Sequence, residues 1–279
     1  MSRYSRTLSA LAVVAGLALV GGTLPAAQAA PAEFKYKTYK VPTARSELGS
    51  MTLGSDGNLW FTEGRDIFTP NADPDTGGTF HSNIGRITPS GAITEFRVDG
   101  VNGGSVIPHD IVQGPSGVLY FTSNSGLGRI GTDGVVMPFV PDAPFSVGGM
   151  ELARGGNNIW ITDFNGDNLW RYDTGSGLFT QFPLDPLFDP ADVAVDGLGN
   201  VWFGATRLRE DGVFVDVIGR LDPAGNITTT DVVGEVNAVS IATDSKVWFT
   251  DRFNDTVGYV DPLNANNLQQ FDTAPDAGP

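Results

Sequence analysis

Two stretches of alternating oxygen-bearing side chains are candidates for a metal site. They read Asn71-x-Asp73-x-Asp75-x-Gly77 and Asp163-x-Asn165-x-Asp167. Carboxylate and amide oxygens at every second position are typical of calcium loops. In the first stretch the glycine comes one residue late, in the second it is absent, and no glutamate closes either loop. An ordinary turn built of turn-forming residues is therefore the competing interpretation of both.

Few other residues in the chain could do catalytic chemistry. The sequence has no Cys and only two His, His81 and His109, which excludes disulfides, thiolate metal sites and three-His zinc sites. No Gly-x-Ser-x-Gly elbow and no Gly-rich phosphate loop is present. His109, in Pro108-His109-Asp110-Ile111, is the remaining candidate base. A lone His more commonly only hydrogen-bonds a neighbouring loop.

Composition and charge narrow the range of partners. The chain has 279 residues and a formal net charge of −15. Nucleic acids call for clustered Lys and Arg, and anionic membranes repel an acidic surface, so neither is expected as a partner. A small molecule, a peptide or a glycan remains. Glycine is abundant, with 36 residues, which indicates many tight turns and many short strands.

The N-terminal residues 1–29 are typical of a secretory signal peptide. Arg3 and Arg6 precede an apolar run from Leu8 to Val20, and Ala27-Gln28-Ala29 fits a cleavage site. The run is short for a membrane span, although an uncleaved anchor is the alternative. We therefore expect a secreted, extracellular protein, with residues 30–279 forming one domain, no membrane span after removal of the signal, and a monomeric state.

The rest of the chain repeats itself five times. Each repeat centres on an aromatic anchor flanked by apolar residues, as in Asn58-Leu59-Trp60-Phe61-Thr62-Glu63. The anchors are Trp60, Tyr120, Trp160, Trp202 and Trp248. A second motif follows each anchor, and Ile84-Gly85-Arg86-Ile87 is its first example. Repeats of about 40–45 residues are typical of propeller blades.

Each repeat is interpreted as four strands. In the first repeat we expect strands at 50–53, 59–63, 83–88 and 93–98, with turns at 55–57 and 89–91. The second strand is apolar on successive residues, as expected where neighbouring sheets cover both faces. The sequence thus predicts an all-β fold, a β-propeller of four-stranded blades with five blades visible. A sixth, degenerate blade stays open, as does closure by 34–41, which competes with 268–272 for the last outer strand.

Two insertions and one repeated charge stand out within the repeats. The segments 64–82 and 207–216 lengthen the same connection in the first and fourth blades, where long loops often shape a binding face. Arginines recur at one place of the third strand. We expect them to pair with acids or carbonyls between blades, and we expect the anchors to be core. The arginines are Arg86, Arg129, Arg171 and Arg220.

The pattern Gly-Asn-Leu-Trp-Phe-Thr-Glu, followed by Ile-Gly-Arg-Ile-Thr-Pro and Ile-Thr-Glu-Phe, resembles the virginiamycin B lyase (streptogramin lyase) family of β-propellers. The resemblance covers the chain beyond the signal peptide. It implies a metal, typically magnesium, on one propeller face and opening of the ester ring of streptogramin B antibiotics by elimination. The implied base is a His with a Glu two residues before it and a second Glu just past the second strand.

Only part of that catalytic pattern is matched here. His109 stands at the position of the base, but Ile107 and Asn124 replace the two carboxylates. Glu47 and Glu63 in the neighbouring blade could hold Mg²⁺ or Ca²⁺ near His109. Alternatively, Glu63 and Asp251 are solvated strand ends. The further rim residues that we expect to contact a ligand are Asp110, Asn124, Asp163, Glu235 and Asp251.

Two functions follow from these observations. The intact scaffold with dispersed catalytic residues favours a ligand-binding propeller. The alternative is a metal-dependent carbon–oxygen lyase that opens a cyclic ester, or another propeller enzyme that acts on an ester or lactone. Fold alone does not choose between them.

Overall fold

The computed structural model of the chain describes residues 36–43, 46–64, 82–98, 106–140, 143, 152–163, 166–184, 188–209, 211–251, 254–262 and 264–273. The chain divides into two compact units, Met1–Thr38 and Tyr39–Pro279. All strands lie in the second unit. The predicted signal peptide and the stretch 71–77 fall outside the described residues.

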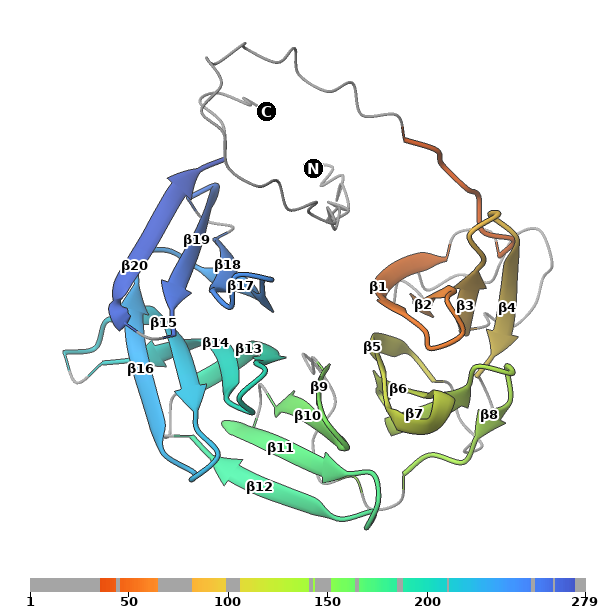
Figure 1. Cartoon of the computed structure of the whole chain (residues 1–279), viewed down its shortest axis with the longest axis horizontal. Coiled ribbons are helices and arrows are strands. Elements are labelled where there is room, and N and C mark those ends of the chain that lie inside the picture. The colour runs from red at the N-terminus through yellow and green to blue at the C-terminus, as the bar shows by residue number, and fades with distance from the viewer. Residues whose placement is uncertain are drawn as a thin grey trace, which may run out of the picture. The chain divides into compact units, whose positions relative to one another are not determined.

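Five four-stranded sheets make up the second unit, which confirms the predicted all-β blades (Figure 1). Within each sheet the strands pair antiparallel in chain order. Blade 1 contains β1 (Glu47–Leu53), β2 (Leu59–Gly64), β3 (Asn83–Ile87) and β4 (Ile93–Arg97). Blade 2 contains β5 (Pro108–Gln113), β6 (Val118–Ser123), β7 (Gly126–Gly131) and β8 (Val136–Met137). Blade 3 contains β9 (Leu152–Gly155), β10 (Asn158–Asp163), β11 (Asn168–Asp173) and β12 (Phe179–Pro183). Blade 4 contains β13 (Phe188–Val195), β14 (Val201–Leu208), β15 (Phe214–Leu221) and β16 (Ile227–Val232). Blade 5 contains β17 (Val236–Ile241), β18 (Val247–Asp251), β19 (Thr256–Asp261) and β20 (Asn264–Asp272).

The helical content of the described residues is one short 3₁₀ turn, Pro115–Gly117. Within this part of the chain, no helix has the length and apolar character that a membrane crossing requires.

The tight turn between the first two strands also positions the anchor. In blade 1 the Asp56 carboxylate accepts hydrogen bonds from Asn58 N (3.2 Å) and from the indole Nε1 of Trp60 (3.1 Å). In blade 4 Asp196 accepts from Trp202 Nε1 in the same way (2.9 Å). The aspartate therefore closes the turn and satisfies the buried indole at once.

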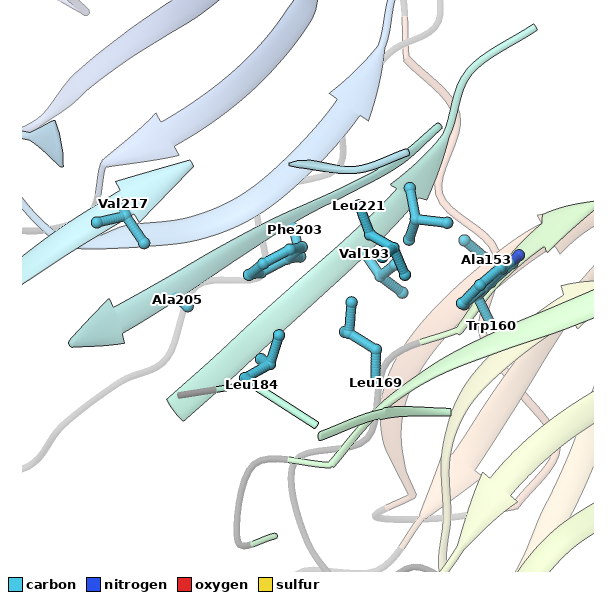
Figure 2. Packing of buried hydrophobic residues seen from close by; sticks show 10 residues of the cluster. Ala153, Trp160, Leu169, Leu184, Val193, Phe203, Ala205, Val217 and Leu221 are labelled. Atoms are coloured by element: carbon cyan, nitrogen blue, oxygen red, sulfur yellow. The ribbon is translucent and has the colours of Figure 1, made fainter. Parts of the chain in front are cut away.

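The core lies between blades and follows one rule. We call the sheet face that carries the anchor the anchor face and the opposite one the rear face. The anchor face of each of the first four blades packs on the rear face of the next, as Trp160 and Leu169 pack with Val193 and Phe203 (Figure 2). The same pairing forms the clusters between blades 1 and 2, 2 and 3, and 4 and 5. The first strands of consecutive blades also contact one another.

The glycine in the third-strand motif has a packing reason. A Cβ atom on Gly85 would overlap the outer edge of the Phe61 ring on the rear face. Gly128 and Gly219 stand in the same relation to Phe121 and Phe203. In the Gly-Arg dipeptide the glycine leaves room for the phenylalanine ring on one face of the sheet. The arginine that follows places its long side chain on the other face.

The prediction that the repeated arginines pair with acids or carbonyls between blades holds for Arg86 and is wrong for Arg129, Arg171 and Arg220, which donate hydrogen bonds within their own blades. Arg86 Nη1 donates to the Thr132 carbonyl of the next blade (3.2 Å), whereas Arg129 donates to the Pro138 carbonyl within its own blade (2.8 Å). Arg171 and Arg220 donate to Thr180 Oγ1 and Asn200 Oδ1. The guanidinium groups of Arg86, Arg171 and Arg220 also lie over aromatic rings, and that of Arg86 is 5.4 Å from the Trp60 centroid.

The competing predictions for the last outer strand resolve in favour of the chain end. β20 is the fourth strand of blade 5, whereas residues 36–41 lie outside any strand. The segment near 39–43 instead meets blade 1, where Thr43 Oγ1 donates to Glu95 Oε2 (2.7 Å). Among the described residues there is no sixth sheet.

The fourth-blade insertion extends a hairpin rather than forming a separate loop. β14 and β15 stay paired as far as Leu208 and Phe214. An ion pair between Arg207 and Asp231 (2.6 Å) ties this extension to β16. Of the first-blade insertion, only Gly64 and Ser82 belong to the described residues.

Candidate functional site

The candidate site lies at the rim where the first strand of each blade begins and its second strand ends. In blade 1 Glu47 pairs with Gly64, in blade 2 Pro108 pairs with Ser123, and in blade 5 Val236 pairs with Asp251. Blades 1 and 2 meet there as well, since a Cβ on Gly64 would lie 3.3 Å from the Pro108 carbonyl oxygen. The strands that carry Glu47, Glu63 and His109 are therefore neighbours.

His109 lies on β5 with its side chain exposed. Its backbone carbonyl accepts a hydrogen bond from Thr62 Oγ1 of blade 1 (2.9 Å), which fixes the strand. Within the described part of the chain, no group hydrogen-bonds its imidazole. Protein atoms around the ring desolvate the imidazolium and lower the pKa of His109 below its usual value. The ring is therefore neutral at neutral pH and able to accept a proton.

The two positions where the family pattern places carboxylates are occupied by a structural bridge. Ile107 N donates to Asn124 Oδ1 (2.7 Å), and Asn124 N donates to the Ile107 carbonyl (3.3 Å). The amide side chain therefore acts as a clamp between the segment before β5 and the end of β6. Neither residue offers a carboxylate beside His109.

Glu63 is buried, with 1% of its surface exposed, and so it is not the solvated strand end of the alternative interpretation. Its Oε2 accepts a hydrogen bond from Asn83 Nδ2 (3.2 Å), while its Oε1 is buried without a donor. Burial and the negative charge of Glu95 raise the pKa of Glu63 to about 7. Thr43 N and Oγ1 both donate to Glu95 (2.9 and 2.7 Å). A proton on Glu63 removes the charge repulsion between the two carboxyl groups.

Glu47 is exposed at the start of β1. Among the described residues, no group of three or more His, Asp or Glu side chains is arranged to hold a metal ion. Glu63 is committed to Asn83 and Glu95. Binding of magnesium or calcium at this rim therefore stays a prediction.

The other predicted rim residues have structural partners. Asp110 and Asp163 are both buried. The Asp110 Oδ1 atom accepts a hydrogen bond from Ile111 N (2.7 Å), and Asp163 Oδ2 accepts one from Trp170 Nε1 (3.3 Å). Asp251 is buried too, unlike a solvated strand end, and accepts from Glu235 N (2.9 Å). In the second calcium-like stretch, Gly166 N donates a hydrogen bond to the Asp163 carbonyl (3.2 Å). This backbone bond is typical of a turn and agrees with the turn interpretation.

Sequence reasoning missed three carboxylates. Glu95 belongs to the Glu63 network. Asp192 Oδ2 accepts from Val239 N across blades 4 and 5 (2.6 Å), and desolvation by burial raises the pKa of Asp192 to about 6. Asp216 accepts from Thr206 Oγ1 (2.6 Å), and desolvation together with Glu235 and Asp251 raises its pKa. The repeat pattern could have identified Asp192, because Asp192 and Asp110 occupy the same place in their blades.

The comparisons with known proteins agree with this fold. The model of the virginiamycin B lyase family matches residues 35–210. No curated protein matches the chain. A streptogramin B lyase structure is 18% identical over 85% of this chain and 87% of that chain, with a TM-score of 0.50.

Two further structures share the fold at lower identity. A nidogen/laminin complex is 15% identical, with 82% and 81% of the two chains covered and a TM-score of 0.61. YCF48 bound to D1 peptide is 14% identical, with 85% and 70% covered and a TM-score of 0.57. These likenesses concern the fold alone. Because the family match spans more than half of the sequence, the chain belongs to the virginiamycin B lyase family of β-propellers.

Proposed function

We propose that this chain is a secreted, ligand-binding propeller of the virginiamycin B lyase family that does not open the streptogramin B ring. The bridge between Ile107 and Asn124 is the observation that carries the proposal. It occupies the positions of both implied carboxylates, so neither position offers an acidic group beside His109. Without them, no group among the described residues of that blade hydrogen-bonds the imidazole or forms a cation site that could polarise the ester carbonyl.

The proposed ligand is a peptide bound at the rim that carries Glu47 and His109. Both side chains are exposed there. The net charge of −15 favours peptides with basic residues, because complementary charge speeds association. Two structures that share this fold are YCF48 bound to D1 peptide and a nidogen/laminin complex, so propellers of this kind occur in peptide-bound and protein-bound forms.

One observation favours lyase activity as a second candidate function. His109 is exposed and its pKa is lowered, so it can take a proton at neutral pH. In an elimination it would remove the proton α to the ester carbonyl, and the threonyl oxygen would leave as the ring opens. The family membership supplies the substrate class.

The test is incubation with a streptogramin B depsipeptide, with and without Mg²⁺, followed by chromatography and mass spectrometry. The proposal expects an intact ring. A linear product of unchanged mass that disappears in His109→Ala would overturn it in favour of the lyase. The double variant Ile107→Glu, Asn124→Glu is the matched gain-of-function control, because it restores the implied carboxylates and keeps an acceptor at position 124.

Binding is tested separately by titration calorimetry with a basic peptide and an acidic peptide of equal length. We expect heat of binding for the basic peptide, weakened by Glu47→Gln and by added salt. Equal binding of the two peptides, or none, contradicts the proposed ligand class.

A further inference from the structure

Burial at the blade interfaces follows a rule that four of the five anchor faces obey. Every anchor from blade 1 to blade 4 is buried, and so is the residue that opens the third-strand motif. These residues are Trp60, Tyr120, Trp160 and Trp202, with Ile84, Leu127, Leu169 and Ile218. Each of these pairs lies in a cluster with the rear face of the following blade.

The anchor face of blade 5 breaks the rule. Trp248 and Val257, which occupy the same two places, are only partly buried. Phe271 on β20 is 46% exposed. The rings of Trp248, Tyr259 and Phe271 lie beside one another, with centroids 5.1 to 6.4 Å apart. Blade 5 therefore presents an aromatic surface where the other blades are covered.

The rear face of blade 1 is also more exposed than the rear faces of the other blades. Leu59, just before the anchor, is 41% exposed, whereas the residues at the same place in blades 2 to 5 are at most 1% exposed. Met51 is 60% exposed, and its equivalents Ile111 and Val239 are 3% and 6% exposed. This face presents aliphatic side chains that are core elsewhere.

The two exposed faces are the two halves of the interface that the chain builds four times. An aromatic anchor face packs on an aliphatic rear face at each of those four places. Within the described part of the chain, residues on both surfaces remain accessible to solvent, as Leu59, Met51 and Phe271 do. We propose that a second copy of the chain covers them, with the blade 5 anchor face of one copy docked on the blade 1 rear face of the other.

The proposed contact is heterologous, since it joins two different surfaces of the same chain. Such contacts either close into a ring of copies or continue as a chain of copies. The sequence predicted a monomer, and the exposed faces are the reason to propose association instead. The proposal does not depend on the ligand or on catalysis.

Sedimentation velocity of the full chain over a wide range of concentration tests the proposal. We expect the wild type to associate and to dissociate on dilution. Leu59→Glu and Phe271→Lys each place a charge on one half of the interface, so each alone should weaken association more than about tenfold. Leu198→Glu, in an exposed turn of blade 4, is the matched control and should associate like the wild type.

Mixing the two variants provides the sharper experiment. The Leu59→Glu chain keeps an intact blade 5 face, and the Phe271→Lys chain keeps an intact blade 1 face. An equimolar mixture should therefore form dimers that neither variant forms alone. Far-ultraviolet circular dichroism checks folding, and Leu59→Ser and Phe271→Ser replace any variant that fails it. A monomeric wild type, as closure within one chain would give, overturns the proposal, as do variants that still self-associate.

Discussion

Replacing Glu63 by Gln isolates the electrostatic cost of the buried carboxyl pair. Glu63 is the buried end of a network that runs through Asn83 to Glu95 and Thr43. A glutamine has the same shape as the protonated acid. Its carbonyl oxygen can accept from Asn83 Nδ2, and its amide can donate to the Glu95 carboxylate. The variant therefore mimics the protonated network at every pH.

The magnitude follows from the pKa of Glu63, which is raised from 4.5 to about 7 in the folded chain. The folded state holds the proton more tightly than the unfolded state, so stability falls as pH rises from about 4.5 to about 7. At about 1.36 kcal/mol for each pKa unit, the upper limit of the loss is on the order of 3 kcal/mol. In a domain of this size that corresponds to about 6–12 °C in the melting temperature.

Urea denaturation of both proteins at pH 4 and pH 8 measures the effect. We expect Glu63→Gln to match the wild type at pH 4 and to exceed its free energy of unfolding at pH 8 by up to about 3 kcal/mol. Glu47→Gln, on an exposed residue of the same sheet, controls for the loss of one negative charge. A stability difference that is the same at both pH values would refute the reasoning, as would destabilisation at pH 8.

Three further substitutions test the packing and the turns by urea denaturation at neutral pH. Gly85→Ala forces a Cβ atom against the Phe61 ring and should cost about 1–3 kcal/mol, and a neutral result would mean that the ring moves freely. Asp192→Ala leaves Val239 N without its acceptor and should cost about 1–3 kcal/mol, unlike Asp192→Asn, which keeps an acceptor oxygen. Asp196→Ala removes the acceptor of the Trp202 indole and of the turn amides and should cost about 1–3 kcal/mol. For this last variant, unchanged stability together with unchanged tryptophan fluorescence would contradict the assigned role of the turn.

The blades could be predicted from the sequence because each is a local pattern. The expected strand 59–63 is found as Leu59–Gly64, and 83–88 as Asn83–Ile87. Turn residues and an aromatic anchor fix both ends of such strands, so neighbours in sequence are enough. The sequence left two candidates for the last outer strand, because 34–41 and 268–272 carry similar patterns. Only the pairing with β19 in the folded sheet decides between them.

The site could not be predicted to the same degree, because its contacts join distant residues. The terminal position of Glu63 on its strand suggested a solvated carboxylate, yet Asn83 and Glu95 from the next two strands bury it. The clamp by Asn124 depends on a backbone amide seventeen residues away. Alternation within a strand shows which side chains share a face, but not which of them meet across the sheet.

The serial order of the strands has a consequence for how the molecule opens. Every strand pairs with a strand next to it in the chain, and each blade packs on the blades beside it. Stability in such an array is a sum of local and nearest-neighbour contributions, as in a one-dimensional lattice. Among the residues that the structure describes, blades 2 to 4 pack against a blade on both sides, whereas blades 1 and 5 of one chain each pack against a single blade. Amide hydrogen exchange should therefore be slowest in the middle of the array, with opening that begins at either terminal blade and advances inward.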